Sequence, residues 1–255
     1  MILALNIGNS NITFGSYTKD GKLVFSSRLF ADTALSSDEL LYKMVNMLAL
    51  YGAEPQEVTD VIFSSVVPAL TPRMREALHK MCEAPVMEVG PGLKSGVRIR
   101  MDNPAQLGAD LVAGAVGAIS KFPCPCILFD LGTATTISVV ARDTSFLGGI
   151  IIPGVYISYN ALTSRTAQLP QVSLEAPPHV IGKNSIDSMK SGSVYGTAAM
   201  IDGICERIEE EIGEKATVVA TGGIAGVVIP YCKREIIHSD NLILEGLRLL
   251  YERNR

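Results

Sequence analysis

The sequence predicts an α/β fold of two similar domains, each a mixed β-sheet flanked by helices, with a ligand cleft between them. The first observation behind this prediction is a phrase that occurs twice, as LALNIGNSNITF at residues 3–14 and as LFDLGTATTISV at residues 128–139. The offset from Asn6 to Asp130 is 124 positions, close to half of the 255 residues. The second observation is that strands and helices alternate in the same order in each half, which is typical of layered α/β domains.

Hydrophobic patterning predicts the elements of the first half. Ser36–Glu39 forms a capping box that opens a helix, and Gly52 ends that helix. Thr71-Pro72 has the form of a cap and first turn of a second helix, and Asn103-Pro104 begins a region that becomes helical. The expected strands are residues 2–7, 11–17, 22–30 and 61–67.

The second half repeats this pattern. The expected elements are strands at residues 126–130, 137–141 and 146–152, a helix near 194–212, a strand at 217–220 and a final helix near 241–252. Lys121–Pro123 is the expected boundary, so that the predicted domains are residues 1–121 and 122–255.

Composition excludes several classes of function. A formal net charge of −4 without a cluster of basic residues gives no electrostatic case for binding nucleic acid. A hydrophobic content of 47% supplies a large core, while no uncharged apolar run is long enough to span a bilayer. The sequence opens directly on a strand rather than on a signal peptide. We therefore expect a cytoplasmic enzyme with no membrane partner.

The five cysteines are expected to be reduced thiols. Cys124 and Cys126 form a Cys-x-Cys pair, but zinc needs two further ligands at suitable spacing and the three histidines are isolated. The Gly-x-Ser-x-Gly elbow of many hydrolases and the Walker phosphate loop are both missing.

The repeated phrase has the residue types that phosphate binding requires. Gly8 and Gly132 permit backbone conformations closed to other residues and remove a side chain that would hold a phosphate away. The small polar residues that follow offer hydroxyls, amides and backbone N–H groups to an anion. Asn6 and Asp130 stand at the strand ends, where a carboxylate can hold a cation that bridges phosphate oxygens. One such hairpin alone would indicate an ordinary glycine turn, whereas two copies favour a phosphate site.

These hairpins, together with Thr221–Gly223 after a strand, resemble the actin-like ATPase and sugar-kinase superfamily, a duplication of a ribonuclease H-like domain. Over nearly its full length the chain is similar to type III pantothenate kinases. The stretches that carry the similarity are NIGNSNITFG, FSSVVPALT, VGPGLKSGVRIRMDNP, LGAD, DLGTATT, LGGIIIPG, VIGKNSIDSMKSG, ATGG and LEGLRLLYERN.

The resemblance implies an ATP-dependent kinase with a nucleotide cleft between its domains. In that family the acceptor is the primary alcohol of pantothenate, and the product, 4'-phosphopantothenate, is the first intermediate on the way to coenzyme A. It also implies Mg²⁺, a monovalent cation such as K⁺ or NH₄⁺, and a homodimer that binds the acceptor close to the dimer interface.

Matched by position, the resemblance assigns roles to individual residues. Asp110 would be the general base and Asp130 would hold the monovalent cation, while Ser185 would reach the acceptor from the partner subunit. The expected ATP-binding residues are Asn6, Ile7, Gly8, Asn9, Ser10, Asn11, Ile12, Thr13 and Thr133. The expected substrate-binding residues are Met101, Gly108, Ala109, Asp110, Leu111 and Ser185. Judged without the family, Asp110 is equally well explained as a carboxylate that stabilises a helix start.

Three positions depart clearly from the family pattern, and Ser185 is a mild change from the Thr of the family. Asn6 stands where the family has Asp, Leu111 where it has Arg, and Met101 where it has Tyr. The amide lacks the charge that attracts Mg²⁺, and the two apolar residues replace polar contacts to the acceptor. Two alternatives to a pantothenate kinase therefore stay open: a diverged kinase that acts on another small alcohol, and a catalytically weak nucleotide-binding regulator.

Overall fold

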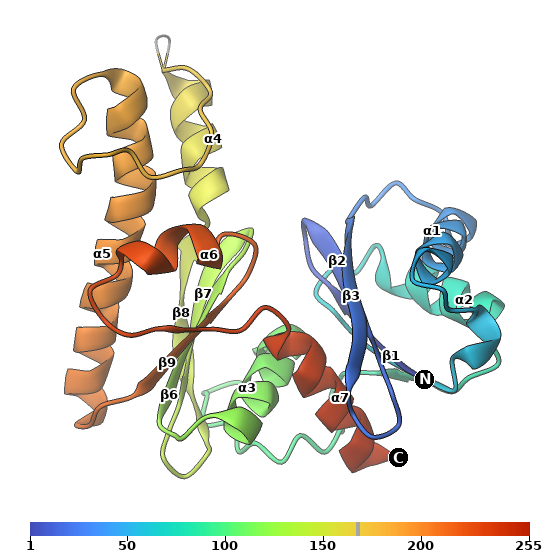
Figure 1. The fold of residues 1–255 in the computed structure, drawn as a ribbon. Coiled ribbons are helices and arrows are strands. Elements are labelled where there is room, and N and C mark those ends of the chain that lie inside the picture. Colours follow the sequence, from blue (N-terminus) through green and yellow to red (C-terminus); the bar gives the residue numbers. More distant parts are fainter. Residues whose placement is uncertain (167–168) are drawn as a thin grey trace. The chain divides into compact units, whose positions relative to one another are not determined.

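The computed structural model describes residues 1–166 and 169–255, which form two compact units (Figure 1). The first unit contains Met1–Val97, Asp102–Ser120 and Asn241–Arg255, and the second contains Arg98–Met101 and Lys121–Asp240. Each unit is built on one mixed sheet, as the sequence predicts, but each sheet has five strands where the sequence predicts four.

The sheet of the first unit has the strand order β3-β2-β1-β4-β5. Its strands are β1 (Ile2–Ile7), β2 (Asn11–Tyr17), β3 (Leu23–Phe30), β4 (Asp60–Ser65) and β5 (Val86–Glu88). β1 pairs antiparallel with β2 and parallel with β4. The central strand β1 is apolar throughout except at Asn6, because it is buried on both faces of the sheet.

Helices cover both faces of this first sheet. Leu3, Leu5 and Ile7 face a core shared with α1 (Ser37–Leu50) and α2 (Thr71–Met81). Ile2 and Ala4 alternate to the other face, where they pack with α3 (Ala109–Lys121) and α7 (Leu242–Asn254). Since α3 begins at Ala109, it presents its first turn and Asp110 at one end of this unit.

The sheet of the second unit has the order β10-β9-β6-β7-β8, which repeats the topology of the first. Its strands are β6 (Cys126–Leu131), β7 (Ala134–Val140), β8 (Phe146–Pro153), β9 (Thr217–Thr221) and β10 (Ile237–His238). Its helices are α4 (Val155–Arg165), α5 (Ser185–Ile212) and α6 (Ala225–Val228). Ile127, Phe129 and Leu131 form a core with α5 and α6. Short 3₁₀ turns also occur among the described residues, at Pro55–Glu57, Pro104–Gln106 and Ile229–Tyr231.

The structure differs from the predicted domain division at the end of the sequence. A boundary after residue 121 assigns the last helix to the second domain, but α7 packs in the first unit. Leu244, Leu247 and Leu250 are buried there against Ile2 and Ala4, and the Tyr251 hydroxyl donates to Asp60 of β4. The periodicity of an amphipathic helix shows which of its faces is apolar but not which sheet that face covers. It could therefore not assign α7 to the first unit.

The predicted elements differ from the observed ones in extent. α5 begins at Ser185, about two turns before the expected residue 194, and the stretch after Asn103 is a 3₁₀ turn that precedes α3. α4 was not expected at all. Val155, Tyr159 and Leu162 share one face of this helix, but only Val155 is buried, and Tyr156 and Ile157 are apolar and exposed elsewhere on it, so the apolar stripe is indistinct.

Candidate active site

The first repeated phrase forms the β1–β2 hairpin of the first unit. β1 and β2 pair as far as Ile7 and Ile12, and the Gly8 N–H closes the turn by donating to the Asn11 carbonyl oxygen at 2.9 Å. The Ser10 carbonyl accepts from the Ala31 N–H, also at 2.9 Å, which ties the turn to the end of β3. All predicted residues of the first phosphate segment, 6 to 13, therefore lie together on one hairpin.

Asn6 stands at the end of β1, directly opposite Ser64 of the parallel strand β4. The buried Ser64 hydroxyl donates to Asn6 Oδ1 at 2.9 Å. Residues 6 to 13 contain amides, hydroxyls and aliphatic groups but no acidic side chain. These donors suit a phosphate, whereas a divalent metal prefers carboxylate ligands, so the residues of this hairpin do not fit a metal ion.

The second repeated phrase forms the β6–β7 hairpin of the second unit, with Leu131 opposite Thr135. The Gly132 N–H donates to the Ala134 carbonyl oxygen at 3.2 Å. Gly154, at the end of β8, packs directly beneath the turn, because a Cβ there would lie 2.1 Å from the Thr133 carbonyl oxygen. The two hairpins thus have the same construction in separate units. In the second, the backbone at Gly154 packs against the turn.

Asp130 occupies the position in the second hairpin that Asn6 occupies in the first. Gly222, in the loop after β9, has φ +98° and leaves room for the carboxylate, since a Cβ there would be 2.6 Å from Asp130 Oδ1. A carboxylate is a hard oxygen donor and fits a cation. Across the described residues there is no cluster of three or more His, Cys, Asp or Glu side chains able to hold a metal ion. A divalent ion here would therefore need phosphate oxygens as further ligands.

Asp110 lies in the first turn of α3. The Leu111 N–H donates to its Oδ1 at 2.8 Å, and burial raises the pKa of its carboxyl although that bond and its own backbone lower it. A Cβ at Gly108 would lie 2.5 Å from the same oxygen and 3.7 Å from Val66. Val66 in turn donates to the Ile7 carbonyl oxygen at 3.0 Å. The first unit thus brings Gly108, Asp110 and the first phosphate hairpin to one edge.

Burial gives Asp110 the character of a base. The desolvated carboxylate holds a proton more tightly than an exposed one, so it is better suited to accept a proton from an alcohol.

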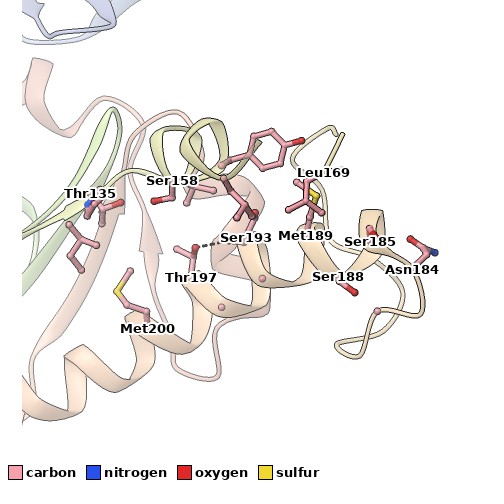
Figure 2. A pocket seen from close by; sticks show the side chains of 18 of the residues that line it. Thr135, Ser158, Leu169, Asn184, Ser185, Ser188, Met189, Ser193, Thr197 and Met200 are labelled. Atoms are coloured by element: carbon pink, nitrogen blue, oxygen red, sulfur yellow. Dashed lines mark hydrogen bonds between the residues drawn. The ribbon is translucent and has the colours of Figure 1, made fainter. Parts of the chain in front are cut away.

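A cavity of about 800 Å³ lies between α4 and α5 of the second unit (Figure 2). Thr135 of β7 lies at one end, and Asn184 and Ser185 lie at the other, where α5 begins (Figure 2). The Asn184 side chain caps α5 by accepting from the Asp187 N–H at 2.8 Å. Small side chains on one face of α5 leave the space open.

Sequence reasoning missed this cavity apart from Ser185. The available signal was a run of small residues at helical spacing, Ser185, Ser188, Gly192 and Gly196, all of which line the cavity. Its other wall is α4, which no pattern predicted.

Met101 lies in the second unit, in a segment that pairs with the start of β8. Ile99 forms a bridge with Phe146, and Arg100 pairs with Asp143 at 2.5 Å. Of the predicted residues, the first unit carries Asn6–Thr13 and Gly108–Leu111, and the second carries Met101, Asp130, Thr133 and Ser185. Within its own unit each group stands near the hairpin or the cavity described above, except Met101.

Comparison with known proteins identifies the family. The family described as type III pantothenate kinase matches residues 2–207. The chain is 41% identical over 256 residues to the type III pantothenate kinase of an Exiguobacterium species, with 100% of both sequences covered. It is 40% identical to the enzyme of an Anaeromyxobacter species, again with full coverage of both.

This chain belongs to the type III pantothenate kinase family. The resemblance read from the sequence is thereby confirmed. Type III pantothenate kinases are small-molecule kinases, and a kinase of this family implies ATP and a divalent metal as well as a small-molecule substrate.

Solved structures agree on the fold of this family. The ethanolamine utilization protein EutJ from Carboxydothermus hydrogenoformans superposes with a TM-score of 0.58 at 12% identity, covering 97% of this chain and 89% of that one. The activator of the 2-hydroxyisocaproyl-CoA dehydratase from Clostridium difficile, with bound ADPNP, gives 0.54 at 12% identity, covering 98% and 93%. In the described part of the type III pantothenate kinase chain, no helix has both the length and the apolar character needed to cross a membrane.

Proposed function

We propose that this chain transfers the γ-phosphoryl group of ATP to pantothenate, giving 4'-phosphopantothenate in the first step of coenzyme A biosynthesis. The observation that carries the proposal is identity of about 40% over the whole length to enzymes named type III pantothenate kinase. The two glycine hairpins and the buried Asp110 supply the parts that such a reaction needs.

The hairpins act on the nucleotide. We assign residues 6–13 of the first hairpin and Thr133 of the second to contacts with ATP. Phosphoryl transfer depends mainly on positioning and on neutralising the charge of the phosphate oxygens. Backbone N–H groups, hydroxyls and amides serve this purpose in a glycine turn that a phosphate can approach closely.

Asp110 acts on the acceptor. Its carboxylate takes the proton from the primary hydroxyl of pantothenate as the hydroxyl oxygen attacks the γ-phosphorus, and the bond from that phosphorus to the oxygen of ADP breaks. Support comes from the burial that raises its pKa and from its place beside the first hairpin. Gly108, Ala109 and Leu111 surround it in sequence and form the acceptor wall in this proposal.

Ser185 and Met101 complete the acceptor site in a homodimer, with Ser185 supplied by the partner subunit. Ile151 of β8 and Tyr156, Ile157 and Leu162 of α4 are exposed apolar side chains in the second unit. Apolar surface of this kind favours association with another chain. The cavity beside Ser185 has a volume suited to a small ligand such as pantothenate.

Cations complete the proposal. Asp130 would hold the monovalent ion, K⁺ or NH₄⁺, and the divalent ion supplies charge neutralisation when it is bound to the phosphates of ATP. A cytoplasmic location is part of the same proposal, since the reaction consumes ATP for coenzyme A synthesis.

The test is an ADP-release assay on the full-length chain with Mg²⁺ and K⁺ or NH₄⁺, in which pantothenate is compared with a panel of small alcohols. Pantothenate-dependent turnover is expected. Met101 and Leu111 favour one second candidate, a kinase of the same fold for a less polar alcohol, and turnover with such an alcohol instead would establish it. ATP binding without any turnover would favour a nucleotide-binding regulator and contradict the proposal.

A further inference from the structure

The two hairpins are equivalent in construction but differ in charge at one position. Asn6 and Asp130 each occupy the penultimate position of the strand that enters a glycine turn, and each strand is central in its sheet. The first carries a neutral amide and the second a carboxylate. Since one chain contains a hairpin with the amide and an equivalent hairpin with the carboxylate, the two can be compared within this protein.

The amide of Asn6 has a defined orientation. Ser64 is fully buried, and its hydroxyl donates to Asn6 Oδ1 at 2.9 Å. With Oδ1 engaged on the β4 side, the Nδ2 group faces away from Ser64 with two N–H donors. The oxygen already accepts one hydrogen bond inside the sheet and carries no charge, which makes it a weak metal ligand, while the Nδ2 group supplies donors that suit an anion.

The charge around the first hairpin points the same way. No acidic side chain occurs from residue 6 to residue 13. Two carboxyl groups lie near this hairpin. Asp110 accepts from the Leu111 N–H within its own helix and is assigned to the acceptor, and Asp32, which follows Ala31, accepts from the Ala34 N–H in its own loop. A carboxylate at position 6 would need a cation between itself and a phosphate, whereas an amide donor needs none.

We propose that the first hairpin binds a phosphate of the nucleotide directly, by donation from Asn6 Nδ2, and holds no metal ion of its own. This inference rests on the proposed function, because ATP is the ligand concerned. Cation binding by the protein is then confined to the second hairpin, at Asp130. The nucleotide affinity of this chain should depend on divalent metal much less than it would with a carboxylate at position 6.

The experiment measures the dissociation constant of the β,γ-imido analogue of ATP by calorimetry on the full-length chain, once with excess EDTA and once with saturating Mg²⁺, at constant K⁺. Asn6→Asp is the central variant. Its carboxylate can still accept from the Ser64 hydroxyl, so the strand contact is kept while the donor is lost. Asn46→Asp makes the same chemical change on the exposed face of α1, where the Asn46 amide donates to the Tyr42 carbonyl oxygen, and controls for net charge.

The wild-type ratio of the two dissociation constants, EDTA over Mg²⁺, is expected to stay below about tenfold. Asn6→Asp should raise that ratio by about tenfold or more, chiefly by weakening binding in EDTA, because the new charge repels phosphate. Asn46→Asp should match the wild type. Asn6→Ala, which removes the donor without adding charge, should weaken binding about equally in both buffers, and it keeps the test decisive if Asn6→Asp does not fold.

Two outcomes separate this inference from the proposed function. An unchanged ratio in Asn6→Asp, in a chain that still turns over pantothenate, overturns the inference alone. A chain that binds the analogue in neither buffer overturns the proposed function and the inference with it.

Discussion

Asp110 combines burial with a hydrogen bond at a helix start, and these act on its proton affinity in opposite directions. Burial, the larger effect, raises the pKa of the carboxyl, and donation from the Leu111 N–H lowers it. The folded chain therefore holds this proton more tightly than the unfolded chain does. The stability that this gives is present at low pH and is lost as the pH rises through the raised pKa. At neutral pH the ionised form is therefore a cost to folding.

Asp110→Asn separates the two roles. Turnover should fall by about 10²–10⁴-fold because the base is lost. The free energy of unfolding at pH 7 should be equal to or greater than that of the wild type, because a neutral amide replaces a desolvated charge and still accepts from the Leu111 N–H. Urea unfolding and the ADP-release assay measure the two effects. A fully active variant would remove Asp110 from its role as base.

Substitutions at Leu111 and Met101 test whether these two residues contact the acceptor. Leu111→Arg, alone and with Met101→Tyr, should lower the Michaelis constant for pantothenate by about tenfold or more, because a guanidinium pairs with the substrate carboxylate. Leu111→Met changes shape without charge and should leave that constant near the wild-type value. Equal constants in all variants would show that these positions do not face the acceptor.

At the scale of residues, the sequence predicted the features formed by neighbouring residues but not the hydrogen bonds between residues far apart in the sequence. The hairpin residues 6–13 and the equivalence of Asn6 with Asp130 follow from a short repeated phrase. The bond from Ser64 to Asn6 joins residues 58 positions apart and depends on the parallel register of β1 with β4. Periodicity carries no information about register between distant strands, so the orientation of the amide had to come from the structure.

At the scale of elements, α3 reaches its position through a close crossing with α7. A Cβ at Gly117 would lie 2.4 Å from the Leu242 carbonyl oxygen, and one at Gly246 would lie 1.7 Å from the Ala113 carbonyl oxygen. Two glycines thus let the helix backbones approach within the first unit. Because Asp110 lies in the first turn of α3, this crossing helps to position the proposed base within the first unit.

Gly246→Ala should push the two helices apart. We expect a loss of about 1–3 kcal/mol of unfolding free energy from overpacking and a lower turnover, because α3 shifts. Gly203→Ala in α5 is the matched control, since a Cβ at that glycine meets nothing within 4 Å. That change should stabilise the chain by up to about 1 kcal/mol through helix propensity. Thermal unfolding of both variants checks the pair, and equal effects would contradict the close crossing.

The cavity shows why one wall of the candidate site could not be predicted. α5 has a signal, since Asn184 caps it and small residues recur along one face, yet small residues also weaken the apolar stripe by which a helix is recognised. In α4 the stripe of Val155, Tyr159 and Leu162 is blurred by the exposed apolar side chains of Tyr156 and Ile157. α4 buries little surface against the core, so it can be recognised only in the folded structure, where it forms one wall of the cavity.

At the scale of the whole molecule, one buried carboxylate links stability to pH. Glu209 is buried near the end of α5, where it pairs with Lys215 at 2.7 Å and Arg234 at 2.6 Å and accepts from the Ala216 N–H. Burial opposes its ionisation, but these bonds outweigh burial and lower its pKa to about 2. The stabilisation is complete above the unfolded value of 4.5 and is lost as the pH falls towards 2.

Glu209→Gln should therefore lower the free energy of unfolding at pH 7 by about 3 kcal/mol, because two cations lose their partner. The difference from the wild type should shrink between pH 4.5 and pH 2, where the wild-type carboxylate takes up its proton. Chemical unfolding at a series of pH values measures this convergence. A difference that stays constant over that range would contradict the assigned cause.

The duplicated architecture was the part of the whole molecule most open to prediction, because each copy of the phrase predicts the same meander. The division into linear halves was not, because α7 belongs with the first unit. Its leucines fit an apolar sheet face, and both units offer one.

The return of α7 also sets an order of events during synthesis. Chains leave the ribosome from the N-terminus at about 5–20 residues per second, and domains generally fold as units. The second unit is complete once Asp240 has emerged, whereas the first still lacks the helix that covers Ile2 and Ala4. The part of the chain that is translated first is therefore the last to complete its core, because the sheet face that α3 covers in part still needs α7.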